Sequence, residues 1–489
     1  MSQFYTAADH FTIVPALILV VFGCAILLFD FLIFPDPRQR KWLLVFVVLA
    51  EVFTGWGLWR QQSYLTLNGL AQMIGFQGSV TIDGFGIFYN SIFVAAGVIV
   101  AIVSYRYLEI SGEHHGEYYG LILFAQSGMY FLAVGTDLIT LFVGLELMAL
   151  SFYVMVGFLR ADKRSNEAAI KYLLLGAFSS GFLAYGFSVM YGLAGSTRLA
   201  DVTAAIAARP AWDPVVFLAL AASSVGLLFK ISAVPFHMWA PDAYEGAPTT
   251  VTAYLAVGSK AASIAFLLRI FLGPLAAART VWEPLLSVVA VATLTVGNLA
   301  AINQTNIKRL LAYSSISHAG YMLLGLIAGN DTGINGIAVY VLVYTFMNLG
   351  AFLVVVALRR ANIIGEGLED IAGLMRKSPG YAVLMLIFLL SLAGIPPTAG
   401  FLGKYYIFLS LIQTGHYALA VIAVIYVAVA VYYYFKIVRS MFTREAAEAA
   451  PLATSFGLRV ALAASGVLTL AIGVYPEPFL RLAQAPLVR

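Results

Sequence analysis

Long runs of apolar residues alternate with short polar segments along the whole chain. A window of about twenty residues, the length of a membrane-crossing helix, finds about fourteen such runs. They are too long and too continuous to be the alternating strands of an outer-membrane barrel. The pattern therefore predicts an all-α polytopic membrane protein with about 14 transmembrane helices. The runs lie roughly at 12–34, 42–60, 83–105, 117–135, 137–159, 167–193, 214–234, 248–272, 281–302, 306–328, 332–358, 379–413, 416–437 and 455–475.

Composition supports a membrane protein and excludes several other classes. Of the 489 residues, 61% are hydrophobic and 11% are charged, whereas soluble proteins have about 45–50% apolar and about 25% charged residues. The net charge of +4 is too small to hold a polyanion. We therefore expect the lipid bilayer as surroundings and no nucleic acid as a partner.

The loop cations predict the orientation in the membrane. Most of the 28 Lys and Arg residues fall in the loops that follow odd-numbered runs. Because such loops are cytoplasmic by the positive-inside rule, both termini are expected in the periplasm. Phe11–Phe34 is interpreted as a first retained helix and not as a signal peptide, because no basic segment precedes it and no cleavage site follows it.

No redox or metal centre is expected within this chain. Cys24 is the only cysteine, which rules out an internal disulfide, an iron–sulfur cluster and c-type haem attachment. The six histidines have no zinc-binding spacing, and there is no P-loop or glycine-rich dinucleotide motif. Any redox cofactor must therefore be bound by another polypeptide.

Two of the apolar runs are interrupted by proline. The seventh breaks at Ala233–Pro241 and the twelfth at Ala393–Gly400. Proline removes a backbone N–H and clashes with the preceding turn, which frees carbonyls at membrane depth. Broken helices in corresponding positions of two halves point to a transport site. Taken alone, each break is equally compatible with an ordinary proline kink.

The spacing of the two breaks predicts internal symmetry. They are five helices apart, and because five is odd, a second copy would cross the membrane in the opposite direction. We therefore expect one membrane domain over 1–489 with two inverted five-helix repeats, helices 4–8 and 9–13. The expected parts are helices 1–3 in 1–116, the first repeat in 117–272, the second in 281–437 and helix 14 in 455–489.

Among the charged side chains within the apolar runs, we single out Glu146, Lys171, Lys230, Lys260 and Lys404 as the informative ones. A lysine at the centre of a membrane helix costs about 2.5–3.5 kcal/mol, and such residues mark functional sites by default. Lys230 and Lys260 lie too deep to reach the interface. Lys171 is only four residues into its run and could extend to the surface, and Glu146 could serve as a structural ion-pair partner.

Other polar residues allow a simpler interpretation. His318 lies in the middle of a helix, where an interior hydrogen bond and a proton-relay role fit equally well. Asp30, Glu51, Arg106 and Lys436 lie near the ends of runs. We expect these four charges to be solvated or to face lipid headgroups.

Three sequence blocks resemble the antiporter-like membrane subunits of respiratory complex I, the proton-translocating NADH:quinone oxidoreductase. They are Lys230–Pro248 with its continuation to Lys260, Arg309–Tyr321 and Leu392–Lys404. The resemblance covers nearly the whole chain. Lys404 favours the subunit N type, because the M type carries a glutamate there. Ile-Pro-Pro at 395–397 departs from the usual single proline, which leaves the geometry of that break open.

The resemblance implies proton-translocating roles in the first half of the chain. Glu146 would be the fifth-helix glutamate at the subunit boundary, and Lys171 its lysine partner on the sixth helix. Lys230 would be the central proton carrier next to the break.

The same resemblance assigns three positions further along the chain. Lys260 would be the connecting lysine of the eighth helix, and His318 a histidine on the central axis. Lys404 would be the exit lysine of the twelfth helix.

The implied activity is that of one subunit of a translocase. Burial disfavours the charged form of a lysine and a nearby carboxylate favours it, so a carboxylate that moves toward or away from a lysine can load or release a proton. NADH, FMN, iron–sulfur clusters and quinone are expected in partner subunits of the membrane and peripheral arms, and the location is the bacterial inner membrane. The alternatives are a subunit of a related cation/proton antiporter or membrane-bound hydrogenase, or a stand-alone solute transporter.

Overall fold

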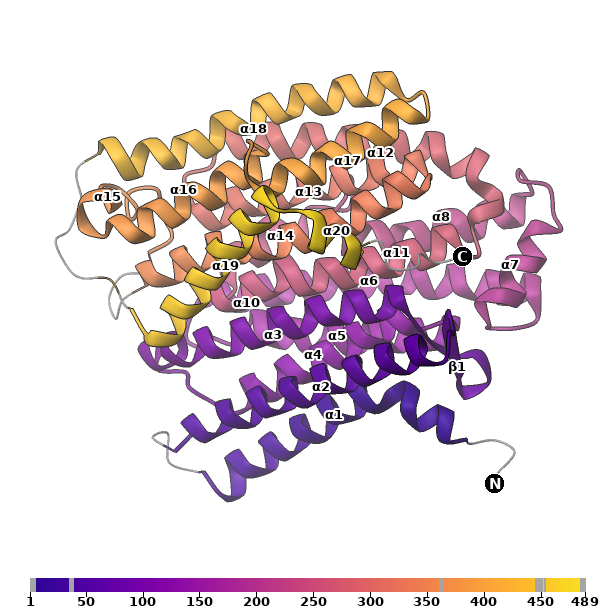
Figure 1. The fold of residues 1–489 in the computed structure, drawn as a ribbon, viewed down its shortest axis with the longest axis horizontal. Helices are drawn as coiled ribbons and strands as arrows, with labels where there is room; N and C mark the ends of the chain where they lie inside the picture. Colours follow the sequence, from indigo (N-terminus) through magenta and orange to yellow (C-terminus); the bar gives the residue numbers. More distant parts are fainter. Residues whose placement is uncertain (1–5, 35–38, 360–364, 445–451, 453, 484–489) are drawn as a thin grey trace.

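The helices of the computed structural model run roughly side by side in one bundle (Figure 1). The structure describes residues 6–34, 39–359, 365–444, 452 and 454–483. Within these residues, 11 helices are long and apolar enough to cross a membrane, and two shorter apolar helices accompany them. The prediction of a helical membrane protein is confirmed.

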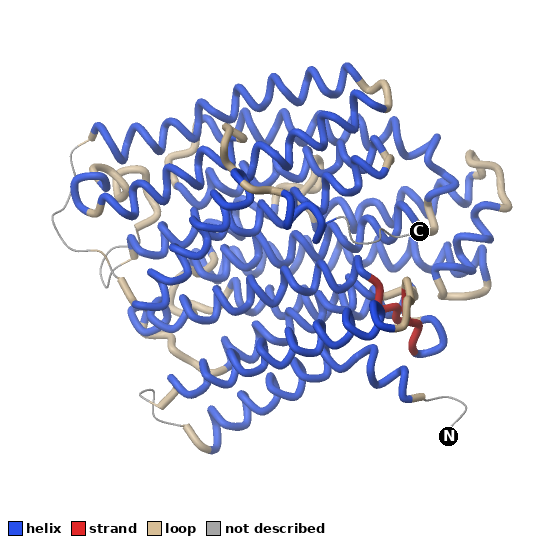
Figure 2. Tube along the Cα trace, in the orientation of Figure 1, coloured by secondary structure: helices blue, strands red, loops and turns tan. Residues whose placement is uncertain are grey.

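The N-terminal part contains three long helices and one small hairpin. Strands β1 and β2 pair antiparallel, with Gln72 opposite Asp83 and Gly75 opposite Val80, and they lie at one end of the bundle (Figure 2). The sequence pattern does not predict this hairpin, because four-residue strands carry too little alternation to be recognised. The bounds are α1 Ala7–Leu32, α2 Lys41–Leu67, β1 Gln72–Gly75, β2 Val80–Asp83 and α3 Gly84–Ser111.

The middle of the chain contains the first broken helix. Helix α8 ends at Lys230 and α9 begins at Trp239, which confirms the predicted break. A π-helical segment, Leu255–Ser259, joins α10 to α11. The bounds are α4 Glu117–Val134, α5 Leu138–Val156, α6 Lys163–Ala194, α7 Leu199–Ala207, α8 Pro214–Lys230, α9 Trp239–Gly246, α10 Thr249–Tyr254 and α11 Lys260–Leu272.

The second broken helix consists of α16 and α17. Helix α16 ends at Ala393, Gly394 follows in the left-handed conformation that glycine adopts readily, and α17 begins at Ala399. Both breaks contain a cis proline bond, Val234–Pro235 and Pro396–Pro397. The bounds are α12 Arg279–Ile302, α13 Ile307–Ala328, α14 Asp331–Leu358, α15 Leu374–Lys377, α16 Pro379–Ala393, α17 Ala399–Gln413, α18 Tyr417–Thr443, α19 Phe456–Val474 and α20 Glu477–Ala483.

Side-chain caps explain where several spans begin. Asp137 and Asp213 accept hydrogen bonds from the first free backbone N–H groups of α5 and α8, and Asn306 does so for α13. Such caps satisfy donors that the helix itself leaves unpaired. The N–H groups of Val215 and Val216 hold the pKa of Asp213 below its usual value. Short polar segments between apolar runs thus fix the ends of the helices.

The centre of the bundle consists of α10–α11, α13 and α14. Nearly all residues of these three spans are buried, whereas α1, α2, α6 and α18 leave much of their apolar surface exposed. Exposed apolar side chains on outer helices are what a lipid environment favours. The central helices are therefore shielded from lipid on most sides, and charged side chains on them face protein.

Candidate functional site

Lys230 lies at the point where the first broken helix is interrupted. It is the last residue of α8 and is 3% exposed. Its Nζ donates to the Tyr153 hydroxyl of α5 at 3.4 Å, and the ammonium group lies 5.5 Å from the centre of the Tyr153 ring. The break thus places a buried ammonium group between two helices with a tyrosine as its polar partner.

Glu146 faces the same region from α5. It precedes Tyr153 by two helical turns, so both residues lie on one face of the helix. The half-buried Glu146 carboxylate accepts a hydrogen bond from the Ser180 hydroxyl at 2.5 Å. Its charge acts on Lys230. Glu146 is therefore coupled electrostatically to the first buried lysine.

Lys171 does not pair with Glu146 in this structure, contrary to the role implied by the resemblance. The Lys171 Nζ lies 2.8 Å from Glu167 and 3.1 Å from Asp242. Its side chain is 47% exposed, which fits the alternative of a lysine that reaches the surface. Asp242 also pairs with Arg309 at 2.8 Å. Lys171 thus joins a charge network between α6, α9 and α13.

Lys260 begins α11 directly after the π-helical segment. It is 3% exposed, and its Nζ donates to the Ser315 carbonyl at 2.7 Å and to the Ser315 hydroxyl. The same hydroxyl lies 3.4 Å from the Tyr244 hydroxyl. A π-helical turn inside an α-helix frequently marks a functional position. Here the π-helical turn directly precedes the buried Lys260, which begins α11 at the centre of the bundle.

His318 is buried on α13 between two tyrosines. Its Nδ1 lies 2.6 Å from the Tyr340 hydroxyl, and its Nε2 lies 3.2 Å from the Tyr434 hydroxyl. Lys260 and Lys404 are the charged groups that act on the ring. Both ring nitrogens therefore have hydroxyl partners, and the histidine lies in the field of two buried lysines.

Lys404 lies after the second break, on α17. It is 3% exposed, and its Nζ donates to the carbonyls of Leu392 at 3.0 Å and Ala393 at 2.9 Å. These carbonyls belong to the last turn of α16, where the break leaves them without helical donors. The ammonium group also lies 4.9 Å from the centre of the Tyr321 ring. The freed carbonyls predicted from the prolines thus bind the buried lysine.

Hydroxyl-bearing side chains are hydrogen-bonded to several of these charged groups, and the sequence analysis did not select them. Their only signal is a tyrosine or serine within an apolar run. That signal is weak in a chain with 27 tyrosines, because tyrosine is also common at membrane interfaces. The residues that contact the buried lysines and His318 in this way are Tyr153, Ser315, Tyr340 and Tyr434.

Two cations counted as loop residues are buried in ion pairs. Lys308 is fully buried at the start of α13, 2.8 Å from Glu366. Arg269 is 4% exposed and lies 2.9 Å from Asp83. Both residues lie near the ends of apolar runs, where the loop-cation count places them outside the spans. Tertiary contacts with a loop and with the N-terminal hairpin bury them instead.

The expectation for the four charges near the ends of runs is partly wrong. Arg106 is exposed and pairs with Glu109, and Asp30 pairs with Arg40 at 2.9 Å near the loop. Lys436 is half-buried and donates to two backbone carbonyls after α12. Glu51, by contrast, is fully buried in α2, because this helix extends to Leu67 and leaves Glu51 near its middle.

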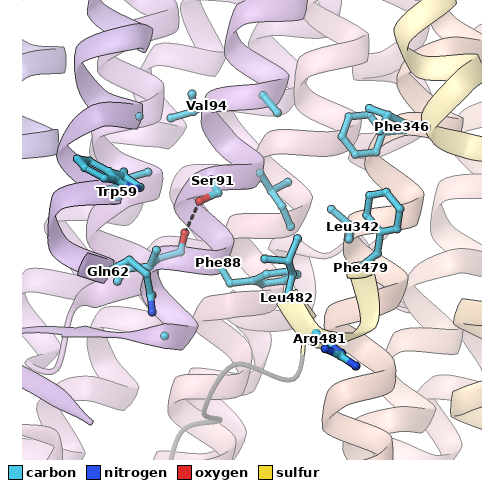
Figure 3. Close-up of a pocket in the computed structure, with 17 residues that line it drawn as sticks. Trp59, Gln62, Phe88, Ser91, Val94, Leu342, Phe346, Phe479, Arg481 and Leu482 are labelled. Carbon is cyan, nitrogen blue, oxygen red and sulfur yellow. Dashed lines mark hydrogen bonds between the residues drawn. The ribbon is translucent and has the colours of Figure 1, made fainter. Parts of the chain in front are cut away.

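A cavity of about 710 Å³ lies away from the buried lysines. Figure 3 shows its lining, in which Phe88, Phe346 and Phe479 are prominent. Trp59, Gln62 and Arg481 are among its few side chains with polar atoms. None of the predicted site residues lines it. Among the described residues there is also no group of three His, Cys, Asp or Glu side chains that could hold a metal ion.

Broken helices with a buried lysine beside each break are typical of ion-translocating membrane subunits, and the comparisons show a family of this class. The family model described as "NADH:quinone oxidoreductase/Mrp antiporter, TM" matches residues 135–430. The chain belongs to this family.

Individual relatives narrow the assignment within the family. The chain is 79% identical to "NADH-quinone oxidoreductase subunit N 2" of Solibacter usitatus, over 100% of this chain and 99% of the relative. It is 54% identical to subunit N 1 of Koribacter versatilis, over 99% and 96%. A chain of respiratory complex I from Thermus thermophilus is 33% identical with a TM-score of 0.80, over 96% of this chain and 100% of that one. A chain of the Mrp complex from Dietzia shares the fold, with a TM-score of 0.83 at 21% identity over 98% and 96%.

Proposed function

We propose that this chain moves protons across the membrane as the subunit N type of NADH:quinone oxidoreductase. The observation that carries the proposal is the pairing of its buried lysines. Lys230, Lys260 and Lys404 donate to hydroxyl or carbonyl oxygens, and none of them pairs with a carboxylate among the described residues. The buried Lys308, in contrast, is paired with Glu366.

This difference separates proton carriers from structural cations. A carboxylate next to a buried ammonium group stabilises its charge and holds the proton there. Neutral oxygens satisfy the hydrogen bonds but leave the proton free to move. Lys230, Lys260 and Lys404 therefore have the surroundings that reversible protonation requires.

The route we propose runs along the buried groups in order. Glu146 sets the electrostatic field at Lys230, and Lys260 and Lys404 act on His318 from the two halves of the chain. Because these groups interact, a proton arriving at one favours release from the next. Lys171 would influence the route through Asp242, its ion-pair partner.

The finer architecture proposed is fourteen crossings with two inverted repeats, helices 4–8 and 9–13, within one domain. The closest helix pairs support it. In the first repeat α4 packs on α5 and α6 on α8; in the second, α12 packs on α13 and α14 on α17. These are corresponding pairs under the proposed symmetry. Each half also has one broken helix with a buried lysine beside the break.

We further propose the surroundings of the chain. It would lie in the bacterial inner membrane among the other membrane-arm and peripheral-arm subunits, with both termini periplasmic. NADH, FMN, iron–sulfur clusters and quinone would be bound by those partners. The hairpin β1–β2 and helix α7 follow even-numbered spans and lie at the same end of the bundle (Figure 1), as this orientation requires.

The test is Lys230→Met in the complete complex. Methionine fills a similar volume but cannot carry a proton, so we expect normal assembly and at least a fivefold lower rate of NADH-driven proton uptake into inverted vesicles. Lys163→Met, at an exposed lysine, is the matched control and should pump normally. Normal pumping by an assembled Lys230→Met complex would overturn the proposed function.

A further inference from the structure

Glu51 is a buried acid outside the row of proton carriers described above. It lies near the middle of α2 and is 0% exposed. Gln126 of α4 donates to its Oε2 at 2.8 Å. Its Oε1 is buried without a hydrogen-bond partner among the described residues, and no cation there forms an ion pair with it.

The neighbouring helix leaves space for this acid. Gly97 of α3 lies where Glu51 and Gln126 meet, and a Cβ at that position would overlap Glu51 Oε1 and Gln126 Oε1. Any larger residue would push the two side chains apart. Three helices therefore combine to form a closed polar site in the N-terminal part of the bundle.

A polar track leads from this site to the central helices. The Tyr254 hydroxyl donates to Gln126 Oε1 at 3.5 Å. Tyr254 is the last residue of α10. The π-helical segment Leu255–Ser259 follows it directly and is followed in turn by Lys260. Glu51 and Tyr118 are the titratable groups near enough to Tyr254 to interact with it electrostatically when they ionise.

The track continues past Tyr118. The Tyr118 hydroxyl lies 2.8 Å from the Thr250 hydroxyl and 2.9 Å from the Ser104 hydroxyl. On the preceding residue, the Thr249 N–H donates to the Tyr107 hydroxyl. A second group of hydroxyls on α3, α4 and α10 thus lies at the first turn of α10, at the other end of that short helix from Tyr254.

We propose that Glu51 is an additional proton-carrying residue, which exchanges its proton with the Lys260 region along the side of Gln126 and Tyr254. A carboxylate buried without a cation is costly, so the resting side chain holds its proton on Oε1. On release the Oε1–H bond breaks and the proton passes to a water molecule that enters the site and carries it onward, while the N–H bond from Gln126 to Oε2 stabilises the carboxylate that remains. This role rests on the proposed function of the chain.

A purely structural role is the competing explanation. A neutral carboxyl group hydrogen-bonded to Gln126 would simply join α2 to α4. Glu51→Gln separates the two roles, because glutamine keeps the volume, the neutrality and the hydrogen bonding of the protonated acid but cannot release a proton.

The experiment measures proton uptake per NADH oxidised in vesicles that contain the complete complex. We expect Glu51→Gln to assemble like wild type and to take up at most half as many protons per NADH oxidised. The matched control is Thr54→Val, which removes a buried hydroxyl one turn further along α2, and it should be silent. Wild-type pumping by Glu51→Gln while Lys230→Met fails would overturn this inference. If Lys230→Met also pumps normally, the proposed function itself fails.

A second measurement uses the unmodified complex and does not depend on assembly of a variant. Hydrophobic carbodiimides react with protonated carboxyl groups in apolar surroundings. We expect peptide mass spectrometry to find the adduct on Glu51, with proton uptake falling in proportion to its labelling. Labelling of other carboxyl groups in this chain without Glu51 would overturn the inference.

Discussion

The environment of each charged side chain distinguishes residues of the same type. Lys308 and Lys404 are both buried lysines, yet one is fixed by a carboxylate and the other is held by two carbonyl groups. Lys171 is exposed and shares Asp242 with Arg309. A lysine that shares a carboxylate with an arginine is coupled to that arginine, since both cations interact with the same negative charge, Lys171 through Oδ2 and Arg309 through Oδ1 of Asp242.

The first prediction tests this coupling by a double-mutant cycle. Removing Lys171 or Asp242 alone leaves the other residue without this ion-pair partner, whereas removing both leaves neither charge unpaired in this way. We therefore expect Lys171→Met and Asp242→Asn to be non-additive by about 0.5–3 kcal/mol in the apparent activation free energy of proton uptake. Glu146→Gln and Lys171→Met should be additive, because the two side chains do not pair. The reverse pattern would restore the pairing implied by the family resemblance.

The two broken helices determine where buried lysines can be hydrogen-bonded. The break between α16 and α17 frees carbonyl oxygens that bind Lys404. Close packing across this break depends on Gly400, where a Cβ would overlap the Ser391 carbonyl and where the backbone N–H donates to the Ser391 hydroxyl. Helices α16 and α17 therefore pack closely against each other although the chain is interrupted between them.

A glycine substitution tests the role of that packing. Gly400→Ala should push α17 away from α16, with an overpacking cost of about 1–3 kcal/mol. We expect lower assembly of the complex or slower proton uptake. Gly380→Ala, in the first turn of α16 with no atom near its Cβ position, should behave like wild type. Blue-native electrophoresis and vesicle assays measure both effects. Equal behaviour of the two variants would refute the importance of this contact.

The most buried spans of the molecule are α10–α11 of the first proposed repeat and α13 and α14 of the second. Helix α10 packs against α14, so the two repeats meet at the centre of the bundle. Exposed cations lie near the ends of the spans, as at Lys163 in the first turn of α6 and Arg376 in the short helix α15. Lys308 and Arg269 are buried and therefore do not count among the exposed loop cations. The remaining asymmetry still points to the same orientation.

Cysteine labelling tests this orientation. In a background with Cys24 replaced by serine, cysteines at Lys163 and Arg376 should react with an impermeant maleimide only from the cytoplasmic side. A cysteine at the exposed Arg209 should react only from the periplasm, as should one near Arg489, which lies outside the described residues. Mass tagging of intact cells and inverted vesicles gives the readout. Reversed labelling would invert the proposed direction of transport.

Local sequence accounts for the helices, their breaks and three of the buried lysines. Apolar runs must be helical in lipid because every backbone group needs an internal partner, and the prolines at 235, 241, 396 and 397 favour a break because proline lacks a backbone N–H. For that reason the two breaks and the place of Lys230, Lys260 and Lys404 within apolar runs could be predicted, although α8 ends three residues before the predicted break at Ala233. The position of Lys171 at the surface could be raised as an alternative but not decided.

Only the tertiary structure decided which groups meet. Ser315 is 55 residues from Lys260 and Asp242 is 71 residues from Lys171, so no local pattern encodes these contacts. The sequence places Glu51 and Asp30 alike near the ends of apolar runs, yet Glu51 is fully buried and Asp30 pairs with Arg40 near a loop. Burial of a side chain depends on its neighbours in space, which the local sequence does not give. The sequence therefore determined the charged residues and the spans that carry them, and packing determined which of those charges are paired, which are exposed and which are held by neutral oxygens.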